Sequence, residues 1–247
     1  MSAEQVRIGG LNHRIAELMP RLSYRRATTR AYRDQIFRLR HDAYLREGAI
    51  AAQPDGLFHD EVDDADNTLL YGLHVDGELV SSLRLTVTLH GNTDLPTAHV
   101  FPDILQPELD AGRVIVDPTR FVVDHAASRR FPELAYLTTR LAWVAAEHFE
   151  ADLLLIAVRS EHVPFYKRLW SAKLVEQARP YPHLSKPICL SWVEHPEVRE
   201  TVEARHSFLR SSSSERERIF GSPSRGGMVP GATVDTTRTF RYDAHVS

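Results

Sequence analysis

The sequence contains a single cysteine, Cys189, and carries a formal charge of only −3 at pH 7. One cysteine cannot form an internal disulfide, and its apolar surroundings predict a buried thiol. The small net charge gives no general attraction to nucleic acids, so none is predicted as a partner. The 13 histidines show no His-Glu-x-x-His or comparable ligand spacing, and no metal site is predicted.

Long apolar runs are also missing. No stretch approaches the roughly 20 apolar residues that a membrane helix needs, and the first residues lack the apolar core of a secretory signal. We therefore expect a cytoplasmic protein without an integral membrane segment. The hydrophobic share of 43% is ordinary for a globular protein, and 247 residues suffice for a sizeable core.

Residues 113 to 123 read RVIVDPTRFVV and predict a central strand, because β-branched residues dominate them. Pro118 interrupts this strand, since proline cannot donate a ladder hydrogen bond, and we predict a β-bulge there. Asp117 and Arg120 would face opposite sides of a regular strand, but one extra residue brings both to the same side. Two charges in an apolar strand indicate either a structural ion pair or a working site.

Hydrophobic periodicity predicts helices and strands on both sides of this stretch. The sequence Asp76-Gly77 predicts a tight hairpin between two of the strands. We find no second core, so we predict an N-terminal helical segment at 1–22, one domain at 23–210 and a disordered tail at 211–247. The predicted helices span 11–22, 29–47, 100–109, 131–149, 163–170 and 195–210, and the further strands span 23–27, 69–75, 78–88, 152–158, 173–179 and 187–193.

Charged residues stand out within these elements. In the second predicted helix, the spacing of Phe37, Arg40 and Tyr44 places a guanidinium between two aromatic rings, although such an arginine more often covers the core with its stem. Arg84 is a lone charge in mid-strand and needs an acidic partner if it is covered. Residues 59–67 read HDEVDDADN, which is typical of a solvated loop, with an active-site lid as the alternative.

In the order of its predicted helices and strands the chain resembles the GNAT acyltransferases. In the spacing of its charged residues it resembles their autoinducer-synthase branch, which contains the acyl-homoserine-lactone synthases and the N-acyl amino acid synthases. That branch has an Arg followed four residues later by an aromatic residue, two Asp residues three apart in a lid, an Arg in the next hairpin strand, and an acid three residues before an Arg-Phe pair. The matching residues are Arg40 with Tyr44, Asp60 with Asp63, Arg84, and Asp117 with Arg120 and Phe121.

The resemblance covers about residues 24 to 193 and implies an α/β GNAT fold, with a mixed, largely antiparallel sheet, a splayed central strand pair and flanking helices. It implies an N-acyltransferase that moves a fatty acyl group from a thioester to the amine of an amino acid. A tyrosine that protonates the leaving thiolate in many GNAT enzymes corresponds to Tyr166, although core packing is the commoner role of an aromatic there. The resemblance further implies catalytic roles for Asp63, Asp117 and Arg120, and substrate contacts by Arg40, Tyr44, Asp60, Arg84, Thr119 and Phe121.

The chain departs from the branch in several places. Ile50 replaces a Trp of the lactone synthases, Asp117 replaces the usual Glu, and Thr119 replaces Ser. The missing Trp favours N-acyl amino acid synthesis over lactone synthesis. The glycine loop that binds coenzyme A has no match in residues 122–134, which favours the acyl-phosphopantetheine of an acyl carrier protein over acyl-CoA as donor, with no bound cofactor.

Basic residues suggest where a carrier protein would bind. Arg129 and Arg130 precede the helix predicted at 131–149, and a helix N-terminus beside two arginines favours an anion. Ordinary solvated surface is an equally good interpretation of these side chains. The candidate contacts to an acidic carrier are Arg129, Arg130, Arg140, Lys167 and Arg168.

Two other functions stay open. One is acyl-homoserine-lactone synthesis, with S-adenosylmethionine as the amine donor. The other is a non-catalytic module that binds acyl carrier protein, in which the charged residues form only a structural network. In that case substitution of Asp117 or Arg120 would unfold the protein, because breaking a buried ion pair costs about 3–5 kcal/mol.

Overall fold

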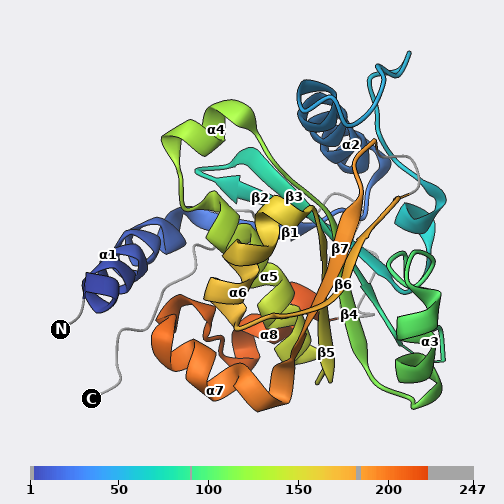
Figure 1. Cartoon of the computed structure of the whole chain (residues 1–247). Coiled ribbons are helices and arrows are strands. Elements are labelled where there is room, and N and C mark those ends of the chain that lie inside the picture. Colours follow the sequence, from blue (N-terminus) through green and yellow to red (C-terminus); the bar gives the residue numbers. More distant parts are fainter. Residues whose placement is uncertain (1–2, 90, 182–184, 222–247) are drawn as a thin grey trace, which may run out of the picture.

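The computed structural model describes residues 3–89, 91–181 and 185–221. Its centre is one seven-stranded sheet with the order β1-β2-β3-β4-β5-β7-β6 (Figure 1). Neighbouring strands are antiparallel except β4 and β5, which are parallel, so the predicted mixed α/β sheet is confirmed. The strands are β1 (Leu22–Arg26), β2 (Thr68–Val75), β3 (Glu78–Val87), β4 (Ile115–Val123), β5 (Leu153–Val158), β6 (Lys173–Arg179) and β7 (Ile188–Glu194).

The two parallel strands separate soon after they begin. Ile115 pairs with Leu153 and Val116 with Leu154, and beyond these pairs β4 and β5 have no common register. Pro118 follows the separation and keeps a regular register position opposite Leu85 of β3. Since β5 has already left, a missing N–H on that side of Pro118 breaks no ladder bond. The splayed strand pair is therefore present, and proline falls where it is tolerated.

The predicted position of the β-bulge is wrong. The β3–β4 register changes between the pairs Arg84–Thr119 and Ser82–Val122, so the extra residue lies at Arg120 and Phe121. Arg120 adopts φ = 55°, in the left-handed region that side chains seldom occupy. The predicted consequence nevertheless holds, because the bulge turns Arg120 to the side of the sheet that carries Asp117.

Helices cover both faces of the sheet. Helices α2 and α3 lie on one face, and α5 to α8 lie on the other, with α1 along the same side (Figure 1). The structure describes α1 (Ala3–Leu18), α2 (Arg30–Arg46), α3 (Pro102–Asp110), α4 (His125–Arg130), α5 (Leu134–His148), α6 (Val163–Trp170), α7 (His195–Arg205) and α8 (Ser213–Phe220), and the short 3-10 helices η1 (Met19–Arg21), η2 (Glu61–Asp64), η3 (Ser160–His162) and η4 (Ser207–Leu209). None of these helices is long and apolar enough to cross a membrane.

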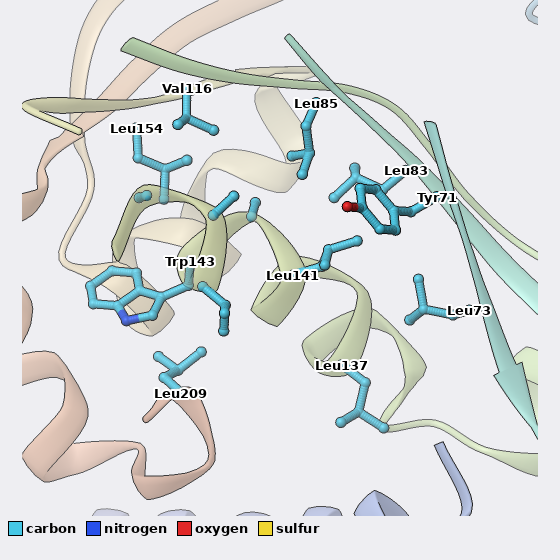
Figure 2. Close-up of a cluster of buried hydrophobic side chains, with 14 of the residues drawn as sticks. Tyr71, Leu73, Leu83, Leu85, Val116, Leu137, Leu141, Trp143, Leu154 and Leu209 are labelled. Carbon is cyan, nitrogen blue, oxygen red and sulfur yellow. The ribbon is translucent and has the colours of Figure 1, made fainter. Parts of the chain in front are cut away.

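The main core lies between α5 and the sheet (Figure 2). Leu141 of α5 points toward Leu83 of β3, and Leu137, one helical turn earlier, lies nearer to Leu73 of β2. All four side chains are almost fully buried. At about 25 cal/mol per Å² of apolar area, burial of this helix face is the main force that holds α5 against the splayed strands.

The predicted disordered tail begins too early. Residues 213–220 form α8, whose Ile219 and Phe220 are buried, and the hydroxyl of Tyr71 donates to the carbonyl of Ile219 at 2.7 Å. Arg140, predicted to be exposed, is buried against Glu215 of this helix. With so few apolar residues in 211–221, the fold of this segment depends on partners far away in the sequence. The rest of the predicted tail, 222–247, lies outside the described residues.

The helix predicted at 131–149 is present as α5, and the sequence did not predict the short helix α4 that precedes it. Arg129 and Arg130 end the short helix α4, and α5 begins only at Leu134. The carboxylate of Asp124 caps α4 by accepting from the amide of Ala127 at 2.8 Å. Arg129 and Arg130 thus lie in the last turn of α4 and shortly before α5, and the anion site predicted there stays a prediction.

Candidate active site

Arg40 lies on the buried face of α2 and is fully excluded from solvent. Its Nη1 donates to both carboxylate oxygens of Asp63, at 2.8 and 2.9 Å, and its guanidinium lies 5.4 Å from the ring centre of Phe37. Thr29 caps the start of the helix, and its hydroxyl accepts from the amide of Tyr32. Arg40 therefore holds a buried carboxylate and does more than cover the core.

The acidic loop folds inward at two of its residues. Asp60 precedes η2 and its backbone N–H donates to Oδ2 of Asp63 at 3.1 Å, while Asp63 itself is buried. Asp64, by contrast, points to solvent and pairs with Arg33. Asp60 and Asp63 are three residues apart, which is one turn of a 3-10 helix, so both side chains point toward the sheet.

Arg84 and Arg120 both bind Asp60. Nη1 of Arg84 contacts Oδ1 of Asp60 and lies 3.5 Å from Asp63, while its Nε donates to the hydroxyl of Thr119 at 2.9 Å. Nη2 of Arg120 donates to Oδ2 of Asp60 at 2.5 Å. Burial alone would raise the pKa of Asp60, but the two guanidinium groups outweigh it and lower that pKa to about 2. We call Arg40, Asp63, Arg84, Asp60 and Arg120 the charged cluster.

The charged cluster is incompletely paired. Three arginines face two aspartates, which leaves one positive charge in excess. Four of its guanidinium nitrogens are buried and find no hydrogen-bond partner among the described residues: Nε and Nη2 of Arg40, Nη2 of Arg84, and Nη1 of Arg120. A buried donor without a partner costs about 1–3 kcal/mol. Such an arrangement indicates a place for an anionic ligand.

Asp117 lies next to the charged cluster but binds elsewhere. It is fully buried, and its carboxylate accepts from the amide and the hydroxyl of Thr97 at 2.9 and 2.7 Å. Burial raises the pKa of this carboxyl group. No ion pair between Asp117 and Arg120 occurs in the described part of the chain, so these two charges share a side of the sheet without pairing. Sequence patterns gave no sign of Thr97.

A cavity of about 770 Å³ opens where β4 and β5 separate. Its wall contains Thr119, Arg120 and Phe121 of the bulge, Tyr44 of α2 and Tyr166 of α6. Arg120 is the member of the charged cluster that reaches this wall, while Arg40, Asp60, Asp63, Arg84 and Asp117 lie behind it. The cavity therefore meets the charged cluster through the side chain of Arg120.

The two ends of the cavity differ in character. At one end Arg120 is surrounded by aromatic rings, with its guanidinium 5.0 Å from the ring centre of Phe58 and 5.5 Å from that of Tyr181. Neither aromatic was identified from the sequence, since both lie in segments without a periodic pattern. The other end lies between α5 and α6 and is mostly apolar, with Ala135, Thr139, Ala142, Phe165, Tyr166 and Trp170 in its wall.

Tyr166 faces this apolar end from α6. Burial raises the pKa of its phenol, so the hydroxyl keeps its proton through the neutral range. No described residue forms a hydrogen bond with that hydroxyl, which leaves it available to a ligand in the cavity. The side chain also packs against the ring of Trp170, at 5.2 Å between centroids. Tyr166 thus combines core packing with a polar group at the cavity wall.

The predicted carrier contacts lie outside the cavity. Arg129 and Arg130 are exposed on α4, where Arg130 pairs with Glu78. Lys167 and Arg168 are exposed on α6. Ser128, just before the two arginines, belongs to the cavity wall, so α4 adjoins the opening.

Comparison with known families decides the chemistry. The family profile of the N-acyl amino acid synthase FeeM matches residues 35–194. The chain belongs to this family. It is therefore an acyltransferase that transfers an acyl group to an amine, as the resemblance in the sequence implied. The FeeM family match contains the whole charged cluster and Tyr166, whereas α1 and α8 lie outside it.

Solved structures share the fold. The N-acyl amino acid synthase FeeM from uncultured soil microbes superposes with a TM-score of 0.63 at 19% identity, over 77% of this chain and 99% of that one. The acyl-homoserine-lactone synthase LasI gives 0.52 at 12% identity, over 69% and 88%. The CoA-dependent acyl-homoserine-lactone synthase BjaI gives 0.51 at 16% identity, over 80% and 97%. A search of curated proteins finds no match.

Proposed function

We propose that this FeeM-family protein is a cytoplasmic enzyme that joins a fatty acyl group, carried as a thioester on acyl carrier protein, to the amine of an amino acid. The observation that carries the proposal is the charged cluster beside the cavity, with its excess positive charge and its unpaired arginine donors. An amino acid supplies the carboxylate that such a cluster lacks, and its amine supplies the nucleophile.

Arg120 holds the acceptor in this proposal. Its Nη1 has no partner in the described structure, although its other two guanidinium nitrogens bind Asp60. A carboxylate in the cavity can accept from Nη1 after a small shift of the Arg120 side chain, and Tyr44 and Tyr181 belong to the same cavity wall. Arg40, Arg84, Asp60 and Asp63 fix the position of Arg120 from behind and contribute the positive field.

The nearby positive charge also prepares the amine. An ammonium group that enters a partly desolvated site beside three guanidinium groups is disfavoured, so its pKa falls and it loses a proton to water. Asp63 and Asp117, for which the resemblance implied catalytic roles, lie behind the cavity wall. We assign them positioning roles, Asp63 toward Arg40 and Asp117 toward Thr97.

The bulge provides hydrogen-bond donors for the thioester carbonyl. Arg120 and Phe121 are out of register with β3, and β5 has separated from this part of β4. Backbone N–H groups at Arg120 and Phe121 can therefore face the cavity and stabilise the negative oxygen that forms during acyl transfer. Loss of one such donor typically costs about 10²–10³ in rate.

The donor enters through the splayed strands in this account. The acyl chain lies at the apolar end of the cavity, and Tyr166 returns a proton to the departing thiolate. Exposed Arg129, Arg130, Lys167 and Arg168 meet the acidic surface of a carrier protein by charge complementarity. Acyl-CoA is the alternative source of the same phosphopantetheine arm.

The test uses purified protein and a mixture of the common amino acids. Acyl-loaded carrier protein, acyl-CoA and S-adenosylmethionine are supplied in separate combinations, and the products are identified by mass spectrometry. The proposal predicts an N-acyl amino acid, formed faster from the carrier protein. A lactone that appears only with S-adenosylmethionine would assign autoinducer synthesis instead, and no acylated product from any combination would contradict the proposed function.

A further inference from the structure

A second hollow, of about 600 Å³, lies beneath α1. Its floor is apolar and combines residues from three helices, while charged residues form its rim. Arg14 and Glu133 of that rim bind each other at 2.7 Å, which neutralises part of its charge. The apolar wall residues are Ile8, Leu11, Pro132, Tyr136, Phe165 and Leu169. We call this hollow the α1 groove.

Phe165 lines both the cavity and the α1 groove. Its ring contacts Tyr136 of α5, at 5.1 Å between ring centroids, and Tyr136 belongs to the wall of the groove. The side chain is only half-buried, as expected for a ring with open space on two sides. One aromatic side chain of α6 thus stands between the apolar end of the cavity and the groove.

The opposite wall of the cavity contains small residues. Ala135, Thr139 and Ala142 are four and three residues apart, so they form one face of α5. Because the side chains from α5 are small and those from α6 are aromatic rings, the rings of α6 limit the width of this end of the cavity. Among these rings, Tyr166 and Trp170 are buried in the core, whereas Phe165 borders a second space into which a longer ligand can extend.

We propose that Phe165 determines specificity by setting the upper limit of acyl-chain length, with the α1 groove as the space beyond that limit. This inference rests on the proposed function, which assigns the acyl chain to the apolar end of the cavity. The other end is occupied by Arg120 and its aromatic neighbours, so an alkyl chain extends toward α6. Its terminal carbons then meet the ring of Phe165.

The test compares four proteins: the wild type, Phe165→Ala, Leu11→Trp, and the double variant. Each is assayed with a series of saturated acyl carrier thioesters that differ by two carbons. Phe165→Ala opens the groove, and kcat/KM for the donor two carbons longer than the wild-type optimum rises about tenfold, as expected for two methylene groups removed from water. Leu11→Trp fills the groove, so the double variant regains the wild-type limit, while Leu11→Trp alone keeps it.

A second measurement makes the result independent of turnover. Calorimetric binding of N-acyl amino acids of graded chain length shows the same shift, and thermal unfolding shows that the variants are folded. A Phe165→Ala protein that keeps the wild-type length limit in both measurements overturns the inference. If the wild type transfers acyl groups normally and Phe165→Ala keeps the wild-type limit of chain length, only this inference is refuted and the proposed function stands. Absence of transfer from every donor refutes the proposed function, and the binding series still tests the length limit.

Discussion

Two buried clusters of this protein differ in how completely their arginines are paired: a structural cluster, made of Arg140 and Glu215, and the charged cluster. In the first, Arg140 of α5 donates from Nη1 to Glu215 at 2.7 Å, from Nη2 to the carbonyl of Arg210 at 2.8 Å, and from Nε to the carbonyl of Phe208. Every nitrogen of this guanidinium has an acceptor. In the charged cluster, four guanidinium nitrogens have none among the described residues.

The difference separates a structural role from a functional one. A fully bonded arginine fixes the segment that it binds, here η4 and α8, and leaves nothing for a ligand. A cluster with unpaired donors and excess charge is costly in isolation, and its cost is offset when a ligand carboxylate binds. Burial alone does not distinguish the two clusters, since Arg140, Arg40 and Arg84 are all almost fully buried.

The largest expected effect is on stability, at the structural cluster. Arg140→Ala leaves Glu215 buried without its partner and frees two carbonyl groups, so the free energy of unfolding falls by about 3–5 kcal/mol. Urea denaturation measures this loss. The activity per folded molecule stays close to that of the wild type, because Arg140 lies away from the cavity. A folded Arg140→Ala protein without activity would contradict the purely structural role of Arg140.

The next effect is on activity, at the charged cluster. Arg120→Ala lowers kcat/KM for the amino acid by about 100-fold, within the range for loss of a buried charged contact to a ligand. Stability falls less than in Arg140→Ala, because Asp60 keeps Arg84 as a partner. Steady-state kinetics and urea denaturation of the same preparations provide both values.

Arg21→Ala is the matched control for Arg120→Ala, since Arg21 is an exposed arginine that pairs with Asp76. It should change neither kinetics nor unfolding appreciably. If Arg120→Ala instead unfolds the protein, the charged cluster is a structural network, as in a non-catalytic carrier-binding module.

The pH dependence of stability tests the pairing within the charged cluster. The pKa of Asp60 is about 2 in the folded protein and 3.8 ordinarily, so ionised Asp60 stabilises the fold above about pH 4. This contribution, about 2 kcal/mol, is lost as the pH falls from about 4 toward 2. Asp60→Asn removes it, and the stability difference between wild type and variant should shrink over that window. Parallel curves from urea denaturation at graded pH would show that Asp60 is not held by the two arginines.

The smallest expected effect concerns Tyr166. Tyr166→Phe keeps the packing against Trp170 and removes the hydroxyl, so kcat falls about tenfold while KM for the amino acid is unchanged. The value lies below the usual range for a general acid because a thiolate leaves readily. Pre-steady-state kinetics measure the transfer step, and Tyr136→Phe in the α1 groove is the control. Equal rates for Tyr166→Phe and wild type would limit Tyr166 to packing.

The sequence predicted the sheet and the members of the charged cluster, but not their pairing. Alternating apolar residues and the Asp76-Gly77 turn define strands locally, and the spacing of Arg40, Asp60, Asp63, Arg84 and Arg120 carried the resemblance. The binding of Arg120 to Asp60 depends on the bulge at Arg120, which lies beyond the point where β5 separates from β4. Sequence periodicity contains no information on such a separation.

Contacts between residues far apart in the sequence could not be predicted either. Arg140 and Glu215 are 75 residues apart, and Asp117 and Thr97 are 20 apart on different elements. Local patterns made Arg140 an exposed helix residue and 211–221 a tail, because neither segment shows its partner. Tyr181 and Phe58 were not predicted either, because they contact Arg120 from separate loops whose local sequence shows no such contact. The catalytic roles of the predicted site residues stay predictions.

The central claim is that the charged cluster and the adjoining cavity form an N-acyl amino acid synthase site. The most direct test is mass spectrometry of lipid extracts from cells that express the wild type or Arg120→Ala at equal levels of folded protein. We predict an N-acylated amino acid in the wild-type extract that is absent, or reduced about 100-fold, with Arg120→Ala. Identical extracts from the two strains would contradict the claim.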